Sequence, residues 1–523
     1  MTTDFTSRAP ARRRRPQNSD SRIAPAPGAL PLVGHAHRLV RDPLDWLGEC
    51  RQAGPVMRVK LGPRTAYLVC DPELVHRVLT GPEFDKGGPL IIAARELLGN
   101  GLGTSLREDH RRQRRLMQPA FAQPRIDGYT ALMREEAARL ADSWTPHREV
   151  DLIGDLTTTT LRVLIRVLLP TIADIPEAAG LARQIRILFD GTFLRAAVPF
   201  PFLFRLPTPG NHRFDRARRD VSAAIDRIVT AARAQPEAGG LLAALITPDE
   251  AAAQAGDAFT DRDLRDQVMT LFVGGGETSA TTLTWLFHLL ATHPSVERRL
   301  YGELDSVLDG RIAGPADMPQ LPFTRNVLWE TMRLYPPAWI MTRVTLTDVD
   351  LAGHRLPADA EVLFSSYQLH HDPETFPEPH AFDPDRWDRM DRADRHSYIP
   401  FHTGSRKCIG DNFALAEATI ILSAVAAAWR LRPAPDHRPR PQPPLSMAPA
   451  GLHLTAQPRP GRPAGRGADA PSGGRPANQQ TATSSEARHP CRPTTSPDSS
   501  NSPGSMSSPE TGCPRGGPNS TTT

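Results

Sequence analysis

The segment FHTGSRKCIG combines a cysteine with cations, glycines and an aromatic ring. Cys408 precedes IGDNFALAEATIILSAVAAAW, an apolar run with helical spacing, so it lies near a predicted helix N-terminus, where unpaired N–H groups favour a thiolate. Gly404 and Gly410 allow the backbone to approach a bulky flat group, to which Arg406 offers a cation. With Phe401 covering the sulfur, the pattern predicts a functional thiolate, a nucleophile or a metal ligand, rather than a buried structural cysteine.

A second segment whose residues could take part in chemistry is GGGETS, which stands inside a long apolar run. Glycine in a helix interior costs roughly 1 kcal/mol relative to alanine, so a run of glycines there needs a reason. Small residues leave room for a small ligand where the helical hydrogen bonding loosens. Glu277 and Thr278 follow directly, an acid and an alcohol that together can relay protons. The alternative is a flexible kink that carries an ordinary acid.

Further charged residues stand at spacings that bring them onto one helix face. Glu330 and Arg333 in ETMR are three residues apart, a spacing that is also common in ordinary surface pairs. His110 and Arg114 lie one helical turn apart in DHRRQRR. Arg343 belongs to a stretch that reads as a strand. Taken singly, each of these cations is more typical of a solvated surface than of a ligand site.

These segments, in this order, resemble the cytochrome P450 family. FHTGSRKCIG is similar to the family's haem-thiolate loop, GGGETS to its oxygen-binding helix, and ETMR followed by LYPP to its E-x-x-R signature, for which Arg386 would be the third member of a buried charge network. The resemblance implies a mainly α fold with small β-sheets (α+β). It also implies that haem b lies between a long central helix and the cysteine loop. In the glycine run, Gly274 stands where the family more often has alanine.

The resemblance assigns roles to individual residues. Cys408 is expected to be the axial metal ligand, and Glu277 and Thr278 to deliver protons to the oxygen site. The remaining haem-binding residues that it implies are His110, Arg114, Arg343, Phe401 and Arg406.

A large helical scaffold is predicted to hold these side chains. Residues 129–144 and 262–293 have apolar residues at helical spacing, and the second stretch is apolar nearly all round, which indicates a helix through the interior. Residues 56–70 alternate like a strand–turn–strand hairpin, and residues 348–370 add short strands between Gly and Pro turns. We expect a helical body with a small strand-rich region.

Composition divides the chain of 523 residues into three regions. Residues 1–24 are polar and arginine-rich, which predicts a disordered basic arm, and residues 25–458 form the expected haem-thiolate monooxygenase domain. Residues 459–523 are rich in Pro, Gly and Ser and predict a disordered tail. Nucleic-acid binding is not expected, because no aromatic residues interleave with the arginines of the arm.

The cysteines and the N-terminal sequence indicate the cellular compartment. The five cysteines show no paired spacing, so neither a disulfide framework nor a structural zinc site is expected. Residues 1–40 contain no apolar run long enough for a membrane span or a signal peptide. We therefore expect a cytoplasmic protein without a membrane anchor.

Electrons are expected to come from other proteins, a ferredoxin and a ferredoxin reductase, because the remaining length has no room for an FMN or NADPH domain. GNGLGTS suggests a dinucleotide loop, but Thr104 replaces its last glycine and a predicted helix precedes it instead of a strand. A basic docking face for the ferredoxin is predicted at Arg111, Arg112, Arg115 and Lys407.

The substrate is expected to be small and apolar. By resemblance, its pocket is lined by the segment before GNGLG, by residues 186–206, by the long helix and by the stretch after LYPP. These segments carry few charges. Their apolar side chains include Phe189, Phe193, Phe200, Phe202, Phe204, Phe272, Val273, Trp339, Ile340 and Met341.

ETMRLYPP is similar to the same signature in soluble bacterial members of the family that act on terpenoids in secondary metabolism, including antibiotic biosynthesis. We predict hydroxylation or further oxidation of a cyclic, sesquiterpene-like terpene. Fatty-acid hydroxylation is the main alternative. A peroxide-driven enzyme and a haem-binding protein without oxygenase activity are disfavoured by the acid–alcohol pair at Glu277 and Thr278.

Overall fold

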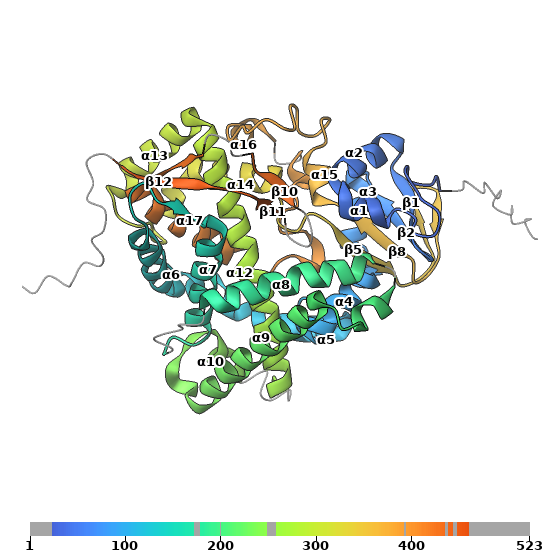
Figure 1. Cartoon of the computed structure of the whole chain (residues 1–523), viewed down its shortest axis with the longest axis horizontal. Coiled ribbons are helices and arrows are strands. Elements are labelled where there is room, and N and C mark those ends of the chain that lie inside the picture. The colour runs from blue at the N-terminus through green and yellow to red at the C-terminus, as the bar shows by residue number, and fades with distance from the viewer. Residues whose placement is uncertain are drawn as a thin grey trace, which may run out of the picture. The chain divides into compact units, whose positions relative to one another are not determined.

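A long central helix, α12 (Asp261–Thr292), organises the described part of the chain (Figure 1). It starts with a capping box, in which the Thr260 hydroxyl accepts the N–H of Asp263 while the Asp263 carboxylate accepts the N–H of Thr260. Its side chains are buried on most sides, and it contacts α7 (Leu152–Leu168), α14 (Pro322–Leu334) and α17 (Asp411–Ala428). The predicted interior helix over residues 262–293 is confirmed.

The computed structural model describes residues 23–171, 178–198, 200–247, 258–391, 394–434, 438–442 and 447–459. The predicted N-terminal arm and C-terminal tail lie almost wholly outside these residues and stay predictions. The other helices are α1 (Ala36–Arg41), α2 (Pro43–Ala53), α3 (Pro72–Thr80), α4 (Gly88–Leu98), α5 (Arg107–Met117), α6 (Gln123–Ser143), α8 (Ala178–Ala197), α9 (Pro209–Ala234), α10 (Gly240–Ile246), α13 (Pro294–Leu308), α15 (Ser366–His370) and α16 (Arg386–Arg389). Short 3₁₀ turns are η1 (Gln118–Phe121), η2 (Pro201–Arg205), η3 (Pro236–Ala238), η4 (Met318–Gln320), η5 (Asp394–Ser397) and η6 (Gly404–Arg406).

The strands form small sheets. The largest has the order β1-β2-β8-β5-β3, in which β2 and β8 run parallel and the other neighbours antiparallel. Its strands are β1 (Val56–Leu61), β2 (Arg64–Val69), β3 (Phe84–Asp85), β5 (Met341–Thr345) and β8 (Glu361–Phe364). Smaller ladders join β4 (Glu149–Val150), β12 (Leu454–Pro458) and β9 (Trp429–Pro433), β6 (Val349–Leu351) and β7 (His354–Leu356), and β10 (Arg440–Gln442) and β11 (Ala448–Ala450).

The predicted hairpin over residues 56–70 is confirmed as β1 and β2, and the fold class is the predicted mainly α fold with small sheets. One difference lies at the end of residues 348–370, where the last five residues form the short helix α15. The hydroxyl of Ser365 caps this helix by accepting the N–H of Gln368 at 3.2 Å.

The apolar helix α17 packs beside α6 and α12 in the interior. Among the described residues it is the one helix long and apolar enough to cross a membrane, but 61% of its apolar window is buried inside the protein, as in a core helix. Its first residue, Asp411, follows closely on Cys408, so the cysteine loop stands at the start of α17 and the glycine run lies on α12, which α17 contacts.

Candidate functional site

The cysteine loop is closed by its own backbone. The Cys408 N–H donates to the Phe401 carbonyl at 2.9 Å, and the Lys407 N–H donates to the Gly404 carbonyl at 3.1 Å. Gly404 has φ +72°, and a Cβ there would lie 2.4 Å from the Leu79 carbonyl oxygen, so only glycine fits. The loop therefore has a fixed shape that presents the cysteine just before the N-terminus of α17, as predicted.

The Cys408 side chain lines a cavity of about 290 Å³. The exposed surface of Cys408 faces this cavity. Protein surrounds the sulfur on its other sides, and this burial raises the pKa of the thiol. The Gly410 N–H acts in the opposite direction and lowers this pKa, but by less than burial raises it. A thiolate in this position therefore needs a positive partner at the sulfur, which a metal ion provides.

Most of the predicted site residues meet at this cavity. Those that line it are His110, Arg114, Thr278, Phe401, Arg406 and Cys408. They come from α5, α12 and the cysteine loop, so the fold brings together segments that are far apart in the sequence.

Two predicted residues do not line the cavity. Arg343, on β5, is buried, donates to the Thr342 carbonyl at 2.9 Å and lies within electrostatic range of Arg406. Burial, and then Arg406, lower the pKa of Arg343 to about 10. Glu277 is buried beside Thr278 on α12 but is absent from the lining of the cavity.

Lys86 also lines the cavity, and the sequence reasoning missed it. Its ammonium donates to the carbonyls of Leu102 at 3.3 Å and Gly103 at 2.7 Å. Burial first, and then the neighbouring cations Arg343 and Arg406, lower the pKa of Lys86 to about 7. The sequence offered only a weak signal for this residue, a lysine between an aspartate and two glycines.

The charges at this end of the cavity do not balance. Lys86, Arg343 and Arg406 gather near one carboxylate, Asp85, which accepts hydrogen bonds from Arg406 and from the Arg107 N–H. Burying cations without compensating anions costs free energy, so a bound group with negative charge would stabilise this site. Two carboxylates on a bound group, as on haem, fit this excess.

The cavity walls also leave room for a flat group. Gly274 and Gly410 both line the cavity, and a Cβ added at either one would meet no neighbouring atom closer than 3.9 Å. The residues present therefore fit haem in three respects: a thiol on one wall, an excess of buried cations, and glycines that leave the space open.

On α12 the alcohol of the predicted acid–alcohol pair faces this space. The Thr278 hydroxyl donates to the Gly274 carbonyl at 2.5 Å. The Thr160 hydroxyl, from α7, donates to the Gly276 carbonyl at 2.5 Å, so an outside donor bonds the helix backbone within the glycine run. The α-helix continues without interruption through the glycines, so the predicted local loosening of its hydrogen bonding is not seen.

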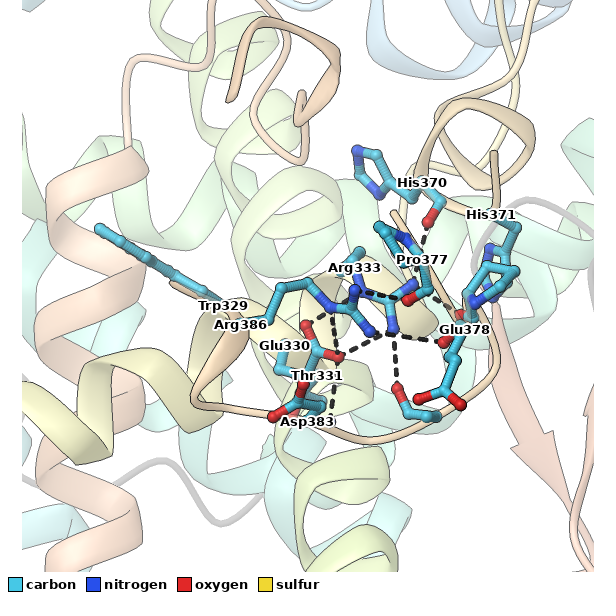
Figure 2. A network of polar contacts seen from close by, with 12 residues as sticks. Trp329, Glu330, Thr331, Arg333, His370, His371, Pro377, Glu378, Asp383 and Arg386 are labelled. Carbon is cyan, nitrogen blue, oxygen red and sulfur yellow. Dashed lines mark hydrogen bonds and ion pairs between the residues drawn. The ribbon is translucent and has the colours of Figure 1, made fainter. Parts of the chain in front are cut away.

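Glu330, Arg333 and Arg386 form the buried charge network that the sequence predicted (Figure 2). Arg333 bonds both oxygens of Glu330, at 2.9 and 2.8 Å, and Arg386 approaches the same carboxylate at 3.4 Å. Arg333 also donates to the carbonyls of His370, Pro379 and Ala381. The network thus ties α14 to the loop that precedes the cysteine segment.

Two of the predicted substrate-lining segments reach the cavity, the long helix with Leu271 and the stretch after LYPP with Ala338, whereas residues 186–206 need correction. Among the described side chains, none in residues 186–206 lines the cavity: Phe189 and Phe193 belong to the core, and Phe202 is exposed. Trp339 is fully buried and packs on Phe193, with ring centroids 6.2 Å apart.

The other side chains predicted for the pocket are also absent from its lining, namely Phe200, Phe204, Phe272, Val273, Ile340 and Met341. Apolar side chains from α7 and α10 line the cavity instead, including Leu164, Val167 and Leu241. Helical spacing identifies an apolar face, but packing between helices decides which of these faces reaches the cavity.

Comparison with known proteins agrees with this geometry. The family model described as "Cytochrome P450" matches residues 24–458. Cyclooctat-9-en-7-ol 5-monooxygenase of Streptomyces melanosporofaciens is 41% identical over 82% of this chain and 93% of its own. Cyclooctatin synthase of the same organism is 42% identical over 83% and 95%. Pentalenene oxygenase of Streptomyces avermitilis is 41% identical over 80% and 93%. The chain belongs to the cytochrome P450 family.

Proposed function

We propose that this protein is a monooxygenase that binds haem b through the Cys408 thiolate and oxidises an apolar substrate. The observation that carries the proposal is a cavity with Cys408 on one wall, Thr278 on another, and buried cations near which the described residues place one carboxylate. When bound, the haem supplies the activation of dioxygen.

The chain's own residues have separate tasks in this proposal. His110, Arg114, Arg343 and Arg406 hold the carboxylates of the cofactor, and Lys86 joins them. Phe401 keeps water from the sulfur. Thr278 holds a proton at the oxygen site through its hydroxyl, and Glu277, buried beside it, passes protons from water toward that hydroxyl.

The reduced carbon monoxide difference spectrum tests the ligand. We expect a Soret band at the thiolate position in the holoenzyme, and its loss in Cys408→Ser. Cys491→Ser, in the predicted tail, is the matched control and should retain the band. A thiolate band that survives in Cys408→Ser would overturn the assignment.

For the substrate we propose a cyclic terpene, sesquiterpene-like in size. The apolar cavity lining supports this class, and so do the names of the relatives, which denote oxidation of cyclooctat-9-en-7-ol and of pentalenene by those proteins. Fatty-acid hydroxylation remains the alternative. A binding titration separates the two: we expect cyclic terpenes to shift the Soret band from low spin to high spin, and a shift with long-chain fatty acids alone would reverse the choice.

We propose that a ferredoxin, reduced by a ferredoxin reductase in the cytoplasm, supplies the electrons. It would dock on α5, where Arg111 is exposed and pairs with Glu108, and beside it at Lys407, which pairs with Asp411. Arg112 instead donates to the Ala258 carbonyl at 2.6 Å, so Arg111→Glu with Arg115→Glu is the better test. Turnover that keeps its rate and its salt dependence in this double variant would contradict the docking face.

A further inference from the structure

The wall of the cavity also includes His402, which follows Phe401 in the cysteine loop. The Nε2 atom of this side chain is buried, and no group among the described residues forms a hydrogen bond with it. A buried polar atom without a partner costs free energy, so folded proteins rarely keep one. An unpaired nitrogen in a side chain that lines a cavity therefore indicates a partner that arrives with a bound group.

The backbone at His402 is strained as well. Its φ of +57° is left-handed, a conformation that glycine adopts freely and that is unfavourable for a residue with a Cβ. The His402 N–H donates to the Ile399 carbonyl at 3.0 Å, and the Cys408 N–H closes the loop on the Phe401 carbonyl, so the loop holds this conformation. For folding alone a glycine would suit the position better. Strain that is maintained at a cavity wall indicates a function for the side chain.

The imidazole of His402 is held edge-on to Phe364, at the end of β8. The ring centroids lie 5.8 Å apart, and the ring planes are inclined at 84°. The guanidinium of Arg343 lies 5.5 Å from the centroid of the same phenylalanine ring, so Phe364 places His402 and Arg343 in one region. Rotation about the Cβ–Cγ bond of histidine is roughly two-fold, and a half-turn exchanges ring nitrogen and carbon positions while the plane is kept. A ring nitrogen can therefore be presented to a group in the cavity without repacking.

The charges around His402 keep its imidazole neutral. Burial first, and then the cations Arg343 and Lys86, lower the pKa of His402 to about 3. A neutral imidazole has one N–H donor and one acceptor nitrogen. His402 can therefore donate a hydrogen bond at this end of the cavity without adding to the excess of buried positive charge.

We propose that His402 is a further cofactor-binding residue, whose neutral imidazole donates a hydrogen bond to a carboxylate that Arg343 and Lys86 also bind. This inference rests on the proposed function, because the carboxylate belongs to the bound haem. The competing interpretation is that the ring only fills space beside Phe364. The two interpretations differ in the task of the ring nitrogens, because a space-filling role needs the ring alone.

The rate of haem release from the holoenzyme tests the proposal. His402→Phe keeps an aromatic ring but removes both nitrogens. It should lose haem to a scavenging protein roughly tenfold faster or more, because a hydrogen bond to a charged group is lost. His402→Gln keeps an N–H donor and should release haem at a rate closer to that of the natural protein. His212→Phe, at an exposed position of α9, is the matched control and should leave the rate unchanged.

The midpoint potential of the haem is a second measurement, which a ring that only fills space would not affect. A carboxylate that loses a donor keeps more of its negative charge, so the potential should fall in His402→Phe and stay near its natural value in His402→Gln. Circular dichroism verifies that each variant is folded. If His402→Phe does not fold, His402→Leu takes its place, since leucine also lacks a donor.

Two results would overturn the assignment of His402. If His402→Phe keeps the natural rate of haem release and the natural potential, the ring only fills space. If His402→Phe and His402→Gln release haem equally fast without a change in potential, the shape of the imidazole is required and its donor is not. In both cases a thiolate band in the reduced carbon monoxide spectrum would still support the proposed function. Absence of that band from the natural holoenzyme would contradict the proposed function instead.

Discussion

At the scale of single residues, the site depends on charges that the fold buries. Lys86, Arg343 and Arg406 lie close together, and burial with mutual repulsion lowers the pKa of Lys86 to about 7. A bound anion reverses this effect, because an opposite charge favours the protonated lysine. The cation cluster and a cofactor with two carboxylates therefore stabilise one another.

The first prediction concerns haem retention. Lys86→Met should release haem roughly ten to a hundred times faster, because it removes a charge-assisted hydrogen bond worth about 1.5–3 kcal/mol. The loss of Soret absorbance in the presence of a haem-scavenging protein measures this rate. Lys60→Met is the control, because Lys60 is exposed and its ammonium donates to the nearby Thr65 hydroxyl at 2.6 Å. Equal rates of haem release in the two variants would show that Lys86 does not help to bind haem.

The second prediction concerns proton delivery. In Thr278→Ala, product formation should fall roughly 100-fold while oxygen is still consumed and appears as hydrogen peroxide, because electrons then arrive without correctly placed protons. The yields of product and of hydrogen peroxide per NADPH consumed measure how the electrons divide between the two outcomes. Thr292→Ala is the control, since Thr292 also bonds a carbonyl four residues back on α12 but stands at its exposed end. An unchanged product yield in Thr278→Ala would favour the peroxide-driven alternative.

At the scale of elements, the close packing of α12 on α7 places the glycine run. A Cβ at Gly276 would lie 2.7 Å from Leu161 Cδ2, whereas a Cβ at Gly274 meets nothing within 4 Å. The two glycines therefore serve different purposes: Gly276 allows α12 and α7 to approach closely, and Gly274 leaves the cavity open.

The third prediction separates these reasons. Gly276→Ala should destabilise the protein by about 1–3 kcal/mol through overpacking, and Gly274→Ala should stabilise it by up to about 1 kcal/mol through helix propensity. Chemical denaturation followed by circular dichroism gives both values. Equal effects would show that the contact with Leu161 relaxes without cost.

The contact between α12 and α17 contains a buried acid. Burial raises the pKa of Glu417, on α17, to about 8, and a hydrogen bond from Ser279 of α12 opposes the shift. The folded protein holds this proton up to about pH 8, whereas the unfolded chain releases it near the ordinary value of about 4.5.

The fourth prediction follows from that difference. The contribution of the protonated Glu417 to the free energy of unfolding is fully present below pH 4.5 and is lost as pH rises through 8. In that range the free energy of unfolding falls by up to about 1.4 kcal/mol per pH unit. The free energy of unfolding, measured between pH 5 and 8, should decline less steeply in Glu417→Gln than in the natural protein. Identical slopes in the two proteins would contradict a protonated Glu417.

At the scale of the whole molecule, the network of Glu330, Arg333 and Arg386 joins α14 to the chain that leads into the cysteine loop (Figure 2). Arg386 adds bonds to the Pro377 and Glu378 carbonyls, so two guanidinium groups fix the path of this irregular segment. We propose residues 25–458 as the folding unit that this network stabilises.

The fifth prediction is that Glu330→Gln destabilises this unit by about 3–5 kcal/mol, because it leaves two arginines buried without their carboxylate. The haem content after expression should fall as well. Glu108→Gln is the control: its i,i+3 pair with Arg111 is exposed, so its loss should change stability by less than about 1 kcal/mol. Thermal unfolding of both variants measures the difference. Similar losses of stability in the two variants would show that the buried network does not stabilise the fold.

The sequence by itself determined the segments that act through local pattern. Cys408 before an apolar helix, the glycines of α12 and the i,i+3 pair of α14 are all visible in consecutive residues, because helical periodicity and backbone conformation are encoded locally. The fold class and the family followed from these segments.

The tertiary structure alone decided which side chains meet. It brought Lys86 beside Arg343 and Arg406, it gave the cavity Leu164 and Leu241, and it left the phenylalanines of residues 186–206 in the core or on the surface. The physical reason is that packing between elements distant in sequence sets which face of a helix is turned to the cavity, and no local periodicity contains that information.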